Sequence, residues 1–162
     1  MFYGKRYRSK TELVFENHIR DIIQSKIIGS KNYFTLLDSK NVADIIICRN
    51  IIIPKIYFIE VKHYSNKKGR IGFGDANGTG FQPEILRKRP KYFEDNLIWV
   101  FQKENQKDFY VLNNEEIIEY ISGGKIGDIG GKQKNFQSKI FDKIKSLNEN
   151  EFIDWLESWL LR

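Results

Sequence analysis

Two apolar stretches decide the fold of this chain: NVADIIIC at residues 41–48 and IYFIEVK at residues 56–62. Hydrophobic and β-branched residues dominate both stretches, which is typical of β-strands. Charged side chains interrupt them, with Asp44 in the first and Glu60 and Lys62 in the second. A charge inside a strand is costly to bury unless it is paired or binds a metal ion. The three residues therefore indicate a functional site within two buried strands.

The spacing of these charges favours their convergence. Glu60 and Lys62 are two positions apart, so on an extended strand they project from the same face. If the two strands pair, Asp44 can converge on that face. Two carboxylates beside a lysine can seat a divalent cation and a polarised water, which is what cutting a phosphodiester requires. The simpler alternative is an ion pair of Glu60 with Lys62 on an edge strand, with Asp44 at the start of a turn. The apolar flanks of each charge favour the site.

Each member of this set has a candidate chemical role. Asp44 and Glu60 offer the oxygen ligands that Mg²⁺ prefers, and the backbone carbonyl of Val61 is a further candidate ligand. Mn²⁺ is the alternative ion. Lys62 can orient the attacking water, offset charge in the transition state, or take a proton itself. The sequence leaves these roles of Lys62 open.

Composition is typical of a globular, basic protein. The 162 residues are 41% hydrophobic and 30% charged, which predicts one domain spanning 1–162. The formal net charge of +6 makes nucleic acid a candidate partner. Cys48 is the lone cysteine, so no internal disulfide is expected and a reducing, cytoplasmic location is predicted. No apolar run approaches the roughly 20 residues of a membrane span. No dinucleotide-type glycine motif follows a strand, so no nucleotide cofactor is expected.

The order of elements predicts an α/β domain with a central mixed sheet flanked by helices. A helix is expected from about Lys10 to Ser25. Its buried stripe is expected to hold Phe15, Ile19, Ile22 and Lys26. A second helix begins near Gln82 and is interrupted by Pro90. The other expected elements are strands at 33–37, 97–101 and 109–112, a helix at 115–121, and amphipathic segments at 138–147 and 151–161.

The charged strands resemble the motif of the PD-(D/E)XK nuclease superfamily, the restriction-endonuclease-like proteins. The matching residues are Ala43-Asp44 and Glu60-Val61-Lys62, with Ala43 where the motif often has Pro. The family core is a helix, a three-stranded meander, a second helix and a further strand, and the elements expected here follow that order. The resemblance implies a restriction-endonuclease-like core at about 10–102, with helical additions at about 103–162.

The resemblance also implies roles for individual residues. The two carboxylates correspond to metal ligands and Lys62 to the catalytic lysine. Many members add a glutamate from the first helix; Glu16 matches that element best, and Glu12, one turn earlier, is its rival. Either can instead be a solvated helix residue. Gln82 stands where several members place a polar residue at the start of the second helix, and its alternative is an ordinary helix cap. His63 is expected to point to the face opposite Lys62, either in a structural role or as a phosphate contact.

Glycines and basic residues after the second charged strand indicate where DNA would be bound. Glycines let a backbone approach nucleic acid closely, and basic side chains contact phosphates. A second Gly-rich stretch at 122–131 can also close over a groove, and either stretch can instead be an ordinary loop. The residues expected to contact DNA are Lys67, Lys68, Arg70, Asn77, Arg87, Lys88, Lys125 and Lys132.

The leading hypothesis is a Mg²⁺-dependent DNA endonuclease, most similar to a small type II restriction enzyme that cuts double-stranded DNA. A homodimer is expected because a two-fold protein matches two-fold DNA symmetry, and the apolar segment 152–161 is either core or dimer interface. A structure-selective nuclease, either a Holliday-junction resolvase or a DNA repair nuclease, is the rival within the class. A non-catalytic DNA-binding module on the same fold and a protein-interaction module are the alternatives outside it.

Overall fold

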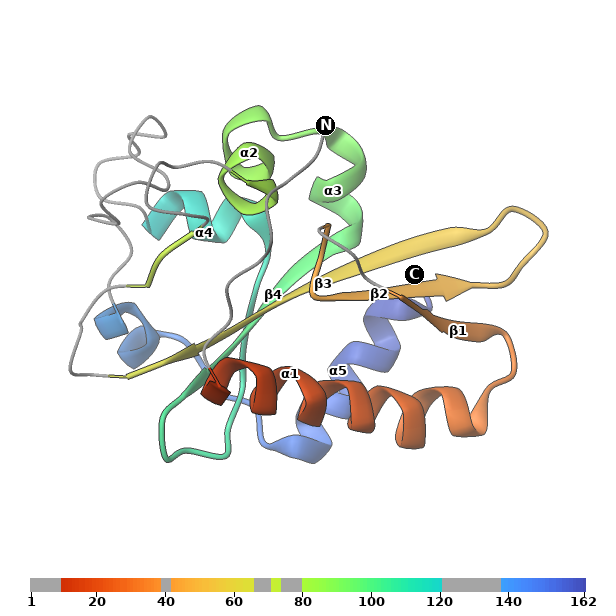
Figure 1. The fold of residues 1–162 in the computed structure, drawn as a ribbon, viewed down its shortest axis with the longest axis horizontal. Coiled ribbons are helices and arrows are strands. Elements are labelled where there is room, and N and C mark those ends of the chain that lie inside the picture. Colours follow the sequence, from red (N-terminus) through yellow and green to blue (C-terminus); the bar gives the residue numbers. More distant parts are fainter. Residues whose placement is uncertain (1–9, 39–41, 66–70, 74–79, 121–137) are drawn as a thin grey trace.

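A computed structural model describes residues 10–38, 42–65, 71–73, 80–120 and 138–162 of the chain (Figure 1). The strands in these ranges are β1 (Phe34–Leu37), β2 (Ile45–Arg49), β3 (Lys55–Tyr64), β4 (Leu97–Lys103) and β5 (Tyr110–Leu112). They form one mixed sheet of five strands in the order β1-β2-β3-β4-β5. The first three are an antiparallel meander, β4 runs parallel to β3, and β5 returns antiparallel to β4.

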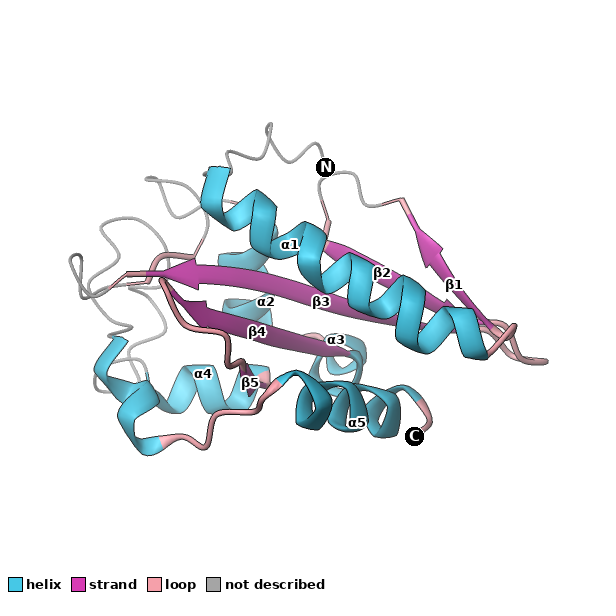
Figure 2. Ribbon diagram, turned by 90° about the horizontal axis from the view of Figure 1, so that it is seen from below, coloured by secondary structure: helices cyan, strands magenta, loops and turns pink. Residues whose placement is uncertain are grey.

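Helices cover both faces of this sheet. They are α1 (Lys10–Ile22), α2 (Phe81–Lys88), α3 (Lys91–Asn96), α4 (Asn114–Tyr120) and α5 (Glu149–Leu160). α1 and α5 lie on one face, and α2, α3 and α4 lie on the other (Figure 1). Figure 2 shows α1 running in front of β2 and β3. The expected α/β class, a mixed sheet between helices, is confirmed. Among the described helices, none has the length and apolar character needed to cross a membrane.

β3 is the central strand, and its side chains alternate between the two layers because successive residues of a strand point to opposite faces. Ile59 and Val61 pack in the core with α1 and α5, whereas Phe58 packs in the core with α2. Glu60 and Lys62 have the same phase as Phe58 and therefore enter the layer of α2. The apolar residues of β3 thus bury both faces of the strand, as its near-continuous apolar sequence predicts.

The first helix continues beyond α1 as a π-helical turn at Ile23–Ile27 and a 3₁₀ turn at Ile28–Ser30. The wider π turn shifts the phase of the buried stripe. Both isoleucines at the ends of the π turn are fully buried, and Lys26 is exposed. The expected stripe is therefore correct up to Ile22 and wrong at Lys26, because a regular helical period does not anticipate a π turn.

Pro90 separates α2 from α3. The residue before it, Arg89, adopts the left-handed conformation with a φ of 47° and ends α2. Its guanidinium lies 2.9 Å from the carboxylate of Glu94 on α3. Proline has no N–H to continue the hydrogen bonding of α2 and stands at the N-cap of α3. The expected interruption at Pro90 is confirmed, and the residues after it form a second short helix.

The last helix, α5, belongs to the core. Its N-terminus is a capping box in which the Asn148 side chain accepts from the Glu151 N–H at 3.0 Å and the Glu151 side chain accepts from the Asn148 N–H at 2.9 Å. The buried residues of the helix are Phe152, Leu156, Trp159 and Leu160. Of the two expectations for this segment, core is thus the one observed. The amphipathic segment before it contains a 3₁₀ helix at Ser138–Lys143.

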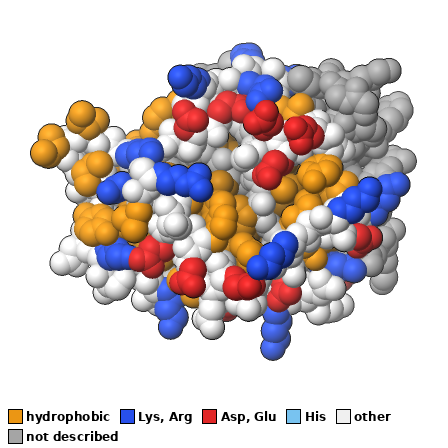
Figure 3. Space-filling view, turned by 180° about the vertical axis from the view of Figure 1, so that it is seen from behind, with side chains coloured by type: hydrophobic (Ala, Val, Ile, Leu, Met, Phe, Trp, Pro, Cys, Tyr) orange, Lys and Arg blue, Asp and Glu red, His pale blue; other side chains and the backbone are white. Residues whose placement is uncertain are grey.

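The turn between β2 and β3 exposes three consecutive isoleucines. Ile52 is completely exposed, at 102% of its reference area, and Ile51 and Ile53 are also exposed. They lie at the end of the hairpin that projects to the right in Figure 1, and hydrophobic side chains gather there at the left of Figure 3. This hairpin end adds nothing to the core that holds β2 and β3 in place.

Ile47 and Ile52 provide a matched test of this arrangement. Ile47→Ala, in the buried part of β2, should lower the free energy of unfolding by about 2–5 kcal/mol because it leaves a cavity. Ile52→Ala should change it by less than about 0.5 kcal/mol. Urea unfolding followed by tryptophan fluorescence measures both. Equal losses in the two variants would contradict the described hairpin.

Candidate active site

Asp44 precedes β2, and Glu60 and Lys62 lie on β3; the three side chains meet on one face of the sheet. The expectation that Asp44 lies inside a strand is wrong, because β2 begins one residue later, at Ile45. Ile45 lies opposite Ile59 in the antiparallel pairing of β2 with β3, so Asp44, just before β2, stands opposite Glu60. Residues that face each other in this way have Cβ atoms about 4.5–5.5 Å apart. Asp44 is 4% exposed, Glu60 0% and Lys62 9%. The strand pairing therefore gathers three buried charges. The simpler alternative of an ion pair on an edge strand is wrong, because β3 is paired with β2 on one side and β4 on the other.

The Asp44 carboxylate takes the place of a backbone acceptor where β2 begins. Its Oδ2 accepts a buried hydrogen bond from the Val61 N–H at 2.8 Å. In an antiparallel pair the N–H and C=O of one residue point to the same neighbouring strand. The Val61 carbonyl therefore points to the same side as its N–H, where Asp44 lies. The Val61 carbonyl must point this way if it is to bind a metal ion together with the carboxylates of Asp44 and Glu60.

Gln82 reaches the same cluster from α2. Its Nε2 donates a hydrogen bond to Glu60 Oε2 at 2.6 Å, and the side chain is buried. The N-cap of α2 is Gly80, whose φ of 112° favours glycine. Gln82 is therefore not the capping residue of the helix. Of its two expected roles, contact with the charged cluster is the one observed.

Lys62 lies over an aromatic ring that sequence reasoning missed. Its Nζ is 5.7 Å from the centre of the Phe73 ring, within the range of a cation–π interaction. Phe73 packs edge-on against Trp99 with ring centroids 5.2 Å apart, and Trp99 Nε1 donates to Asn114 Oδ1 at 2.6 Å. This chain of contacts connects the lysine of the cluster to α4. Phe73 lies in a Gly-rich stretch without periodicity, so no sequence signal pointed to it.

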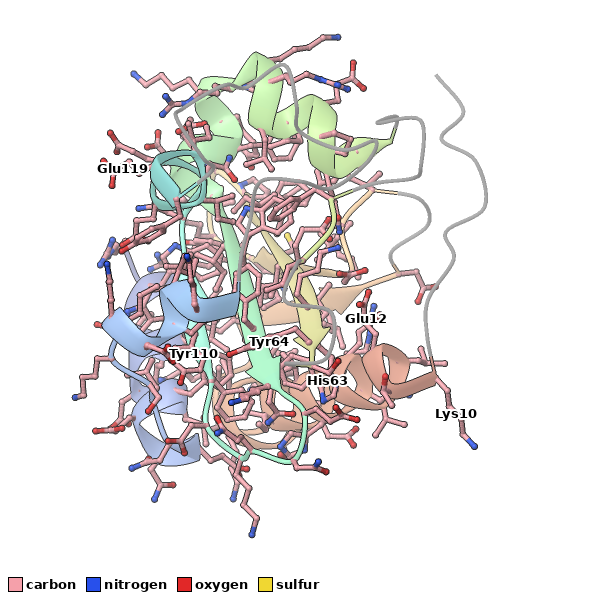
Figure 4. All side chains as sticks on the ribbon, turned by 90° about the vertical axis from the view of Figure 1, so that its left-hand side faces the viewer. Lys10, Glu12, His63, Tyr64, Tyr110 and Glu119 are labelled. Carbon is pink, nitrogen blue, oxygen red and sulfur yellow. The ribbon has the colours of Figure 1, made fainter. Side chains whose placement is uncertain are left out.

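α1 contributes a further carboxylate from the other face of the sheet. Glu16 is 2% exposed, and its Oε1 accepts a hydrogen bond from Arg20 Nε at 3.2 Å. Arg20 Nη2 also donates to the backbone carbonyl of Asp44. The expectation of a solvated helix residue is therefore wrong for Glu16, which is linked to Asp44 through Arg20. Its rival Glu12 is partly buried on the first turn of α1 (Figure 4). Arg20 itself was not anticipated.

His63 lies on the face opposite Lys62, as expected. Its ring centre is 6.0 Å from that of Phe15 on α1. Burial lowers the pKa of the His63 imidazole below the usual 6.5, while the charge of Glu104 acts in the opposite direction. Figure 4 shows His63 at the end of β3 next to the first turns of α1. His63 therefore belongs to the packing between β3 and α1.

Two of the residues expected to contact DNA lie on the last turn of α2. Arg87 and Lys88 are both exposed, and the Lys88 ammonium forms an ion pair with Glu84. They share with Gln82 a helix of eight residues, which is about 12 Å long at 1.5 Å per residue. The other expected contacts fall outside the described residues: Lys67, Lys68, Arg70, Asn77, Lys125 and Lys132.

The donor atoms of the cluster fit a hard divalent cation that keeps part of its water shell. In the part of the chain that the structure describes, no group of three or more His, Cys, Asp or Glu side chains is arranged to hold a metal ion. Mg²⁺ needs fewer, because it usually retains several waters and binds through one or two carboxylates and substrate phosphates. Asp44 and Glu60 are two such carboxylates, and their combined charge exceeds that of Lys62.

No protein-family model matches the chain, and no curated protein gives a significant match. The geometry of the charged cluster is therefore the basis for proposing a function.

The contact of Gln82 with Glu60 predicts a measurable effect on stability. Gln82→Leu should lower the free energy of unfolding by about 1–3 kcal/mol, because a buried carboxylate loses a donor. Lys91→Gln on exposed α3 should change it by less than about 0.5 kcal/mol. Chemical unfolding monitored by circular dichroism measures both variants. A Gln82→Leu protein as stable as the Lys91→Gln control would rule out this contact.

Proposed function

We propose that this protein is a metal-dependent DNA endonuclease that hydrolyses phosphodiester bonds. The observation that carries the proposal is the convergence of Asp44, Glu60 and Lys62, all buried on one face of the sheet. Charged groups are buried at a cost in folding free energy. A cation and a phosphate would offset that cost, and an inert core would not need such a cluster.

Each residue of the cluster has a part in the proposed reaction. Asp44, Glu60 and the Val61 carbonyl would hold Mg²⁺, or Mn²⁺ in its place. When bound, the ion would lower the pKa of a coordinated water and offset charge on the scissile phosphate. Lys62, positioned over Phe73, would orient the attacking water or interact with the developing negative charge. Gln82 would keep Glu60 oriented through its hydrogen bond.

The order of elements supports a restriction-endonuclease-like core for this chain. A helix, an antiparallel three-stranded meander, a helical segment and a further strand follow one another from α1 to β4. This is the order of the core in the nuclease superfamily that the Ala43-Asp44 and Glu60-Val61-Lys62 motifs resemble. Ala43-Asp44 directly precede β2, and Glu60-Val61-Lys62 lie on β3, the strands next to the site in that family. The fold and the motif thus support the same class of enzyme.

DNA is the proposed substrate because of the charge of the chain and the position of its cations. The net charge is +6, and Arg87 and Lys88 lie on the helix that begins beside Gln82. Such side chains bind phosphates without reading sequence. We favour a small type II restriction enzyme that acts on double-stranded DNA as a homodimer, since a two-fold protein matches a two-fold DNA site.

Cleavage of plasmid DNA tests the proposal. The wild-type protein should cut in the presence of Mg²⁺ and not in excess EDTA. Asp44→Asn and Lys62→Met should each lower kcat by about 10²–10³-fold, the loss typical of removing one group that stabilises a transition state. Lys91→Gln, an exposed change on α3, should cut like the wild type.

The pattern of products separates the members of this class. Discrete fragments from duplex DNA support a restriction enzyme, whereas cutting confined to branched DNA supports a resolvase or repair nuclease. DNA binding without cleavage supports a non-catalytic module on the same fold. Cleavage that persists at full rate in both Asp44→Asn and Lys62→Met would exclude the proposed site.

A further inference from the structure

The guanidinium group of Arg20 on α1 connects the buried carboxylate of Glu16 to the backbone of the candidate site. Arg20 donates from Nε to Glu16 Oε1 at 3.2 Å and from Nη2 to the carbonyl oxygen of Asp44. We propose that Arg20, oriented by Glu16, is a positioning residue that holds the Asp44 peptide so that its carboxylate lies beside Glu60. An effect of Arg20 on DNA cleavage rests on the proposed nuclease function. Its effect on the order of the segment around Asp44 does not.

Arg20 and Glu16 form an ion pair whose geometry follows from their spacing and burial on α1. The two residues are four positions apart on α1, so their side chains meet on adjacent turns. The Glu16 side chain is buried, and that of Arg20 is 24% exposed. A guanidinium presents its donors in a rigid planar fork. The bond from Nε to Glu16 therefore sets the direction in which Nη2 points, and that direction is toward Asp44.

Asp44 needs such a contact because it lies at the end of the regular pairing. β2 begins at Ile45, and the last pair of β1 with β2 is Leu37 with Ile46. The Asp44 side chain is held from β3 by the Val61 N–H, whereas its carbonyl is held from α1 by Arg20. Hydrogen bonds that involve a charged group are the stronger class. The two bonds together restrain both the main chain and the carboxylate of one residue.

This geometry gives Glu16 a role different from that of a metal ligand. Its carboxylate contacts the guanidinium, so it influences the site through Arg20. A glutamine in its place can still accept a hydrogen bond from Arg20 Nε, whereas a leucine cannot. Glu16→Gln and Glu16→Leu therefore separate the two roles. A metal ligand would be weakened in both variants, and the positioning contact would be lost only in Glu16→Leu.

Amide hydrogen exchange measured by mass spectrometry tests the structural part without any assay of activity. Arg20→Gln and Glu16→Leu should each speed exchange in the segment 42–48 by about tenfold or more, as expected for loss of a hydrogen bond to a charged group. Exchange in β4 should stay slow. Glu16→Gln should resemble the wild type, and so should Lys26→Gln, an exposed cation on the same helical segment.

Two results would overturn the structural claim. One is unchanged exchange at 42–48 in both Arg20→Gln and Glu16→Leu. The other is faster exchange throughout the protein, β4 included, in both variants, because Arg20 would then support the whole fold and not Asp44 in particular.

Kinetics of DNA cleavage test the catalytic consequence. Arg20→Gln and Glu16→Leu should lower kcat by about tenfold or more, while KM for DNA and the Mg²⁺ concentration for half-maximal rate stay within about threefold. Arg20→Lys should restore only part of kcat, because an ammonium group lacks the fork that reaches both partners. A Glu16→Gln protein that needs as much extra Mg²⁺ as Glu16→Leu would make Glu16 a ligand and overturn the proposal. If the wild type cuts no DNA, the nuclease function fails, and hydrogen exchange alone decides the role of Arg20.

Discussion

The hydrogen bond from the Val61 N–H to the Asp44 carboxylate connects the sheet of this protein to its charged cluster. β2 begins just after Asp44, so a side-chain oxygen serves there as the acceptor for a backbone group of β3. A buried N–H without a partner would be costly, and this contact satisfies it. The same contact keeps an acidic group beside Glu60. One hydrogen bond thus satisfies a backbone group of β3 and joins Asp44 to the charged cluster.

The two helical layers contribute to this cluster from opposite faces of the sheet. From α2, Gln82 donates to Glu60, and from α1, Arg20 donates to the carbonyl of Asp44. Buried charges are tolerated when hydrogen bonds and opposite charges surround them. The Glu60 carboxylate is therefore contacted from α2, and the main chain of Asp44 is contacted from α1. A nuclease built in this way would gain rigid placement of its ligands from the same contacts that stabilise the fold.

Much of the fold and part of the site followed from local patterns. The alternation of side chains in residues 56–62 predicted a strand buried on both faces with Glu60 and Lys62 on the same one, and the structure agrees. Pro90 marked the interruption of the second helix for a purely local reason. The predicted buried stripe of the first helix was wrong at Lys26, because a π turn shifts the helical phase.

The sequence by itself determined which residues carry charge in apolar strands, and so which chemistry the chain can support. Asp44, Glu60 and Lys62 were recognisable because burial of charge conflicts with an apolar pattern that is visible along the chain. The tertiary structure alone decided their partners. Arg20 reaches Asp44 across 24 positions of sequence, and Phe73 lies under Lys62 from a stretch with no periodicity. Contacts of this kind depend on how helices and non-helical segments pack on the sheet, which no local spacing of residues specifies.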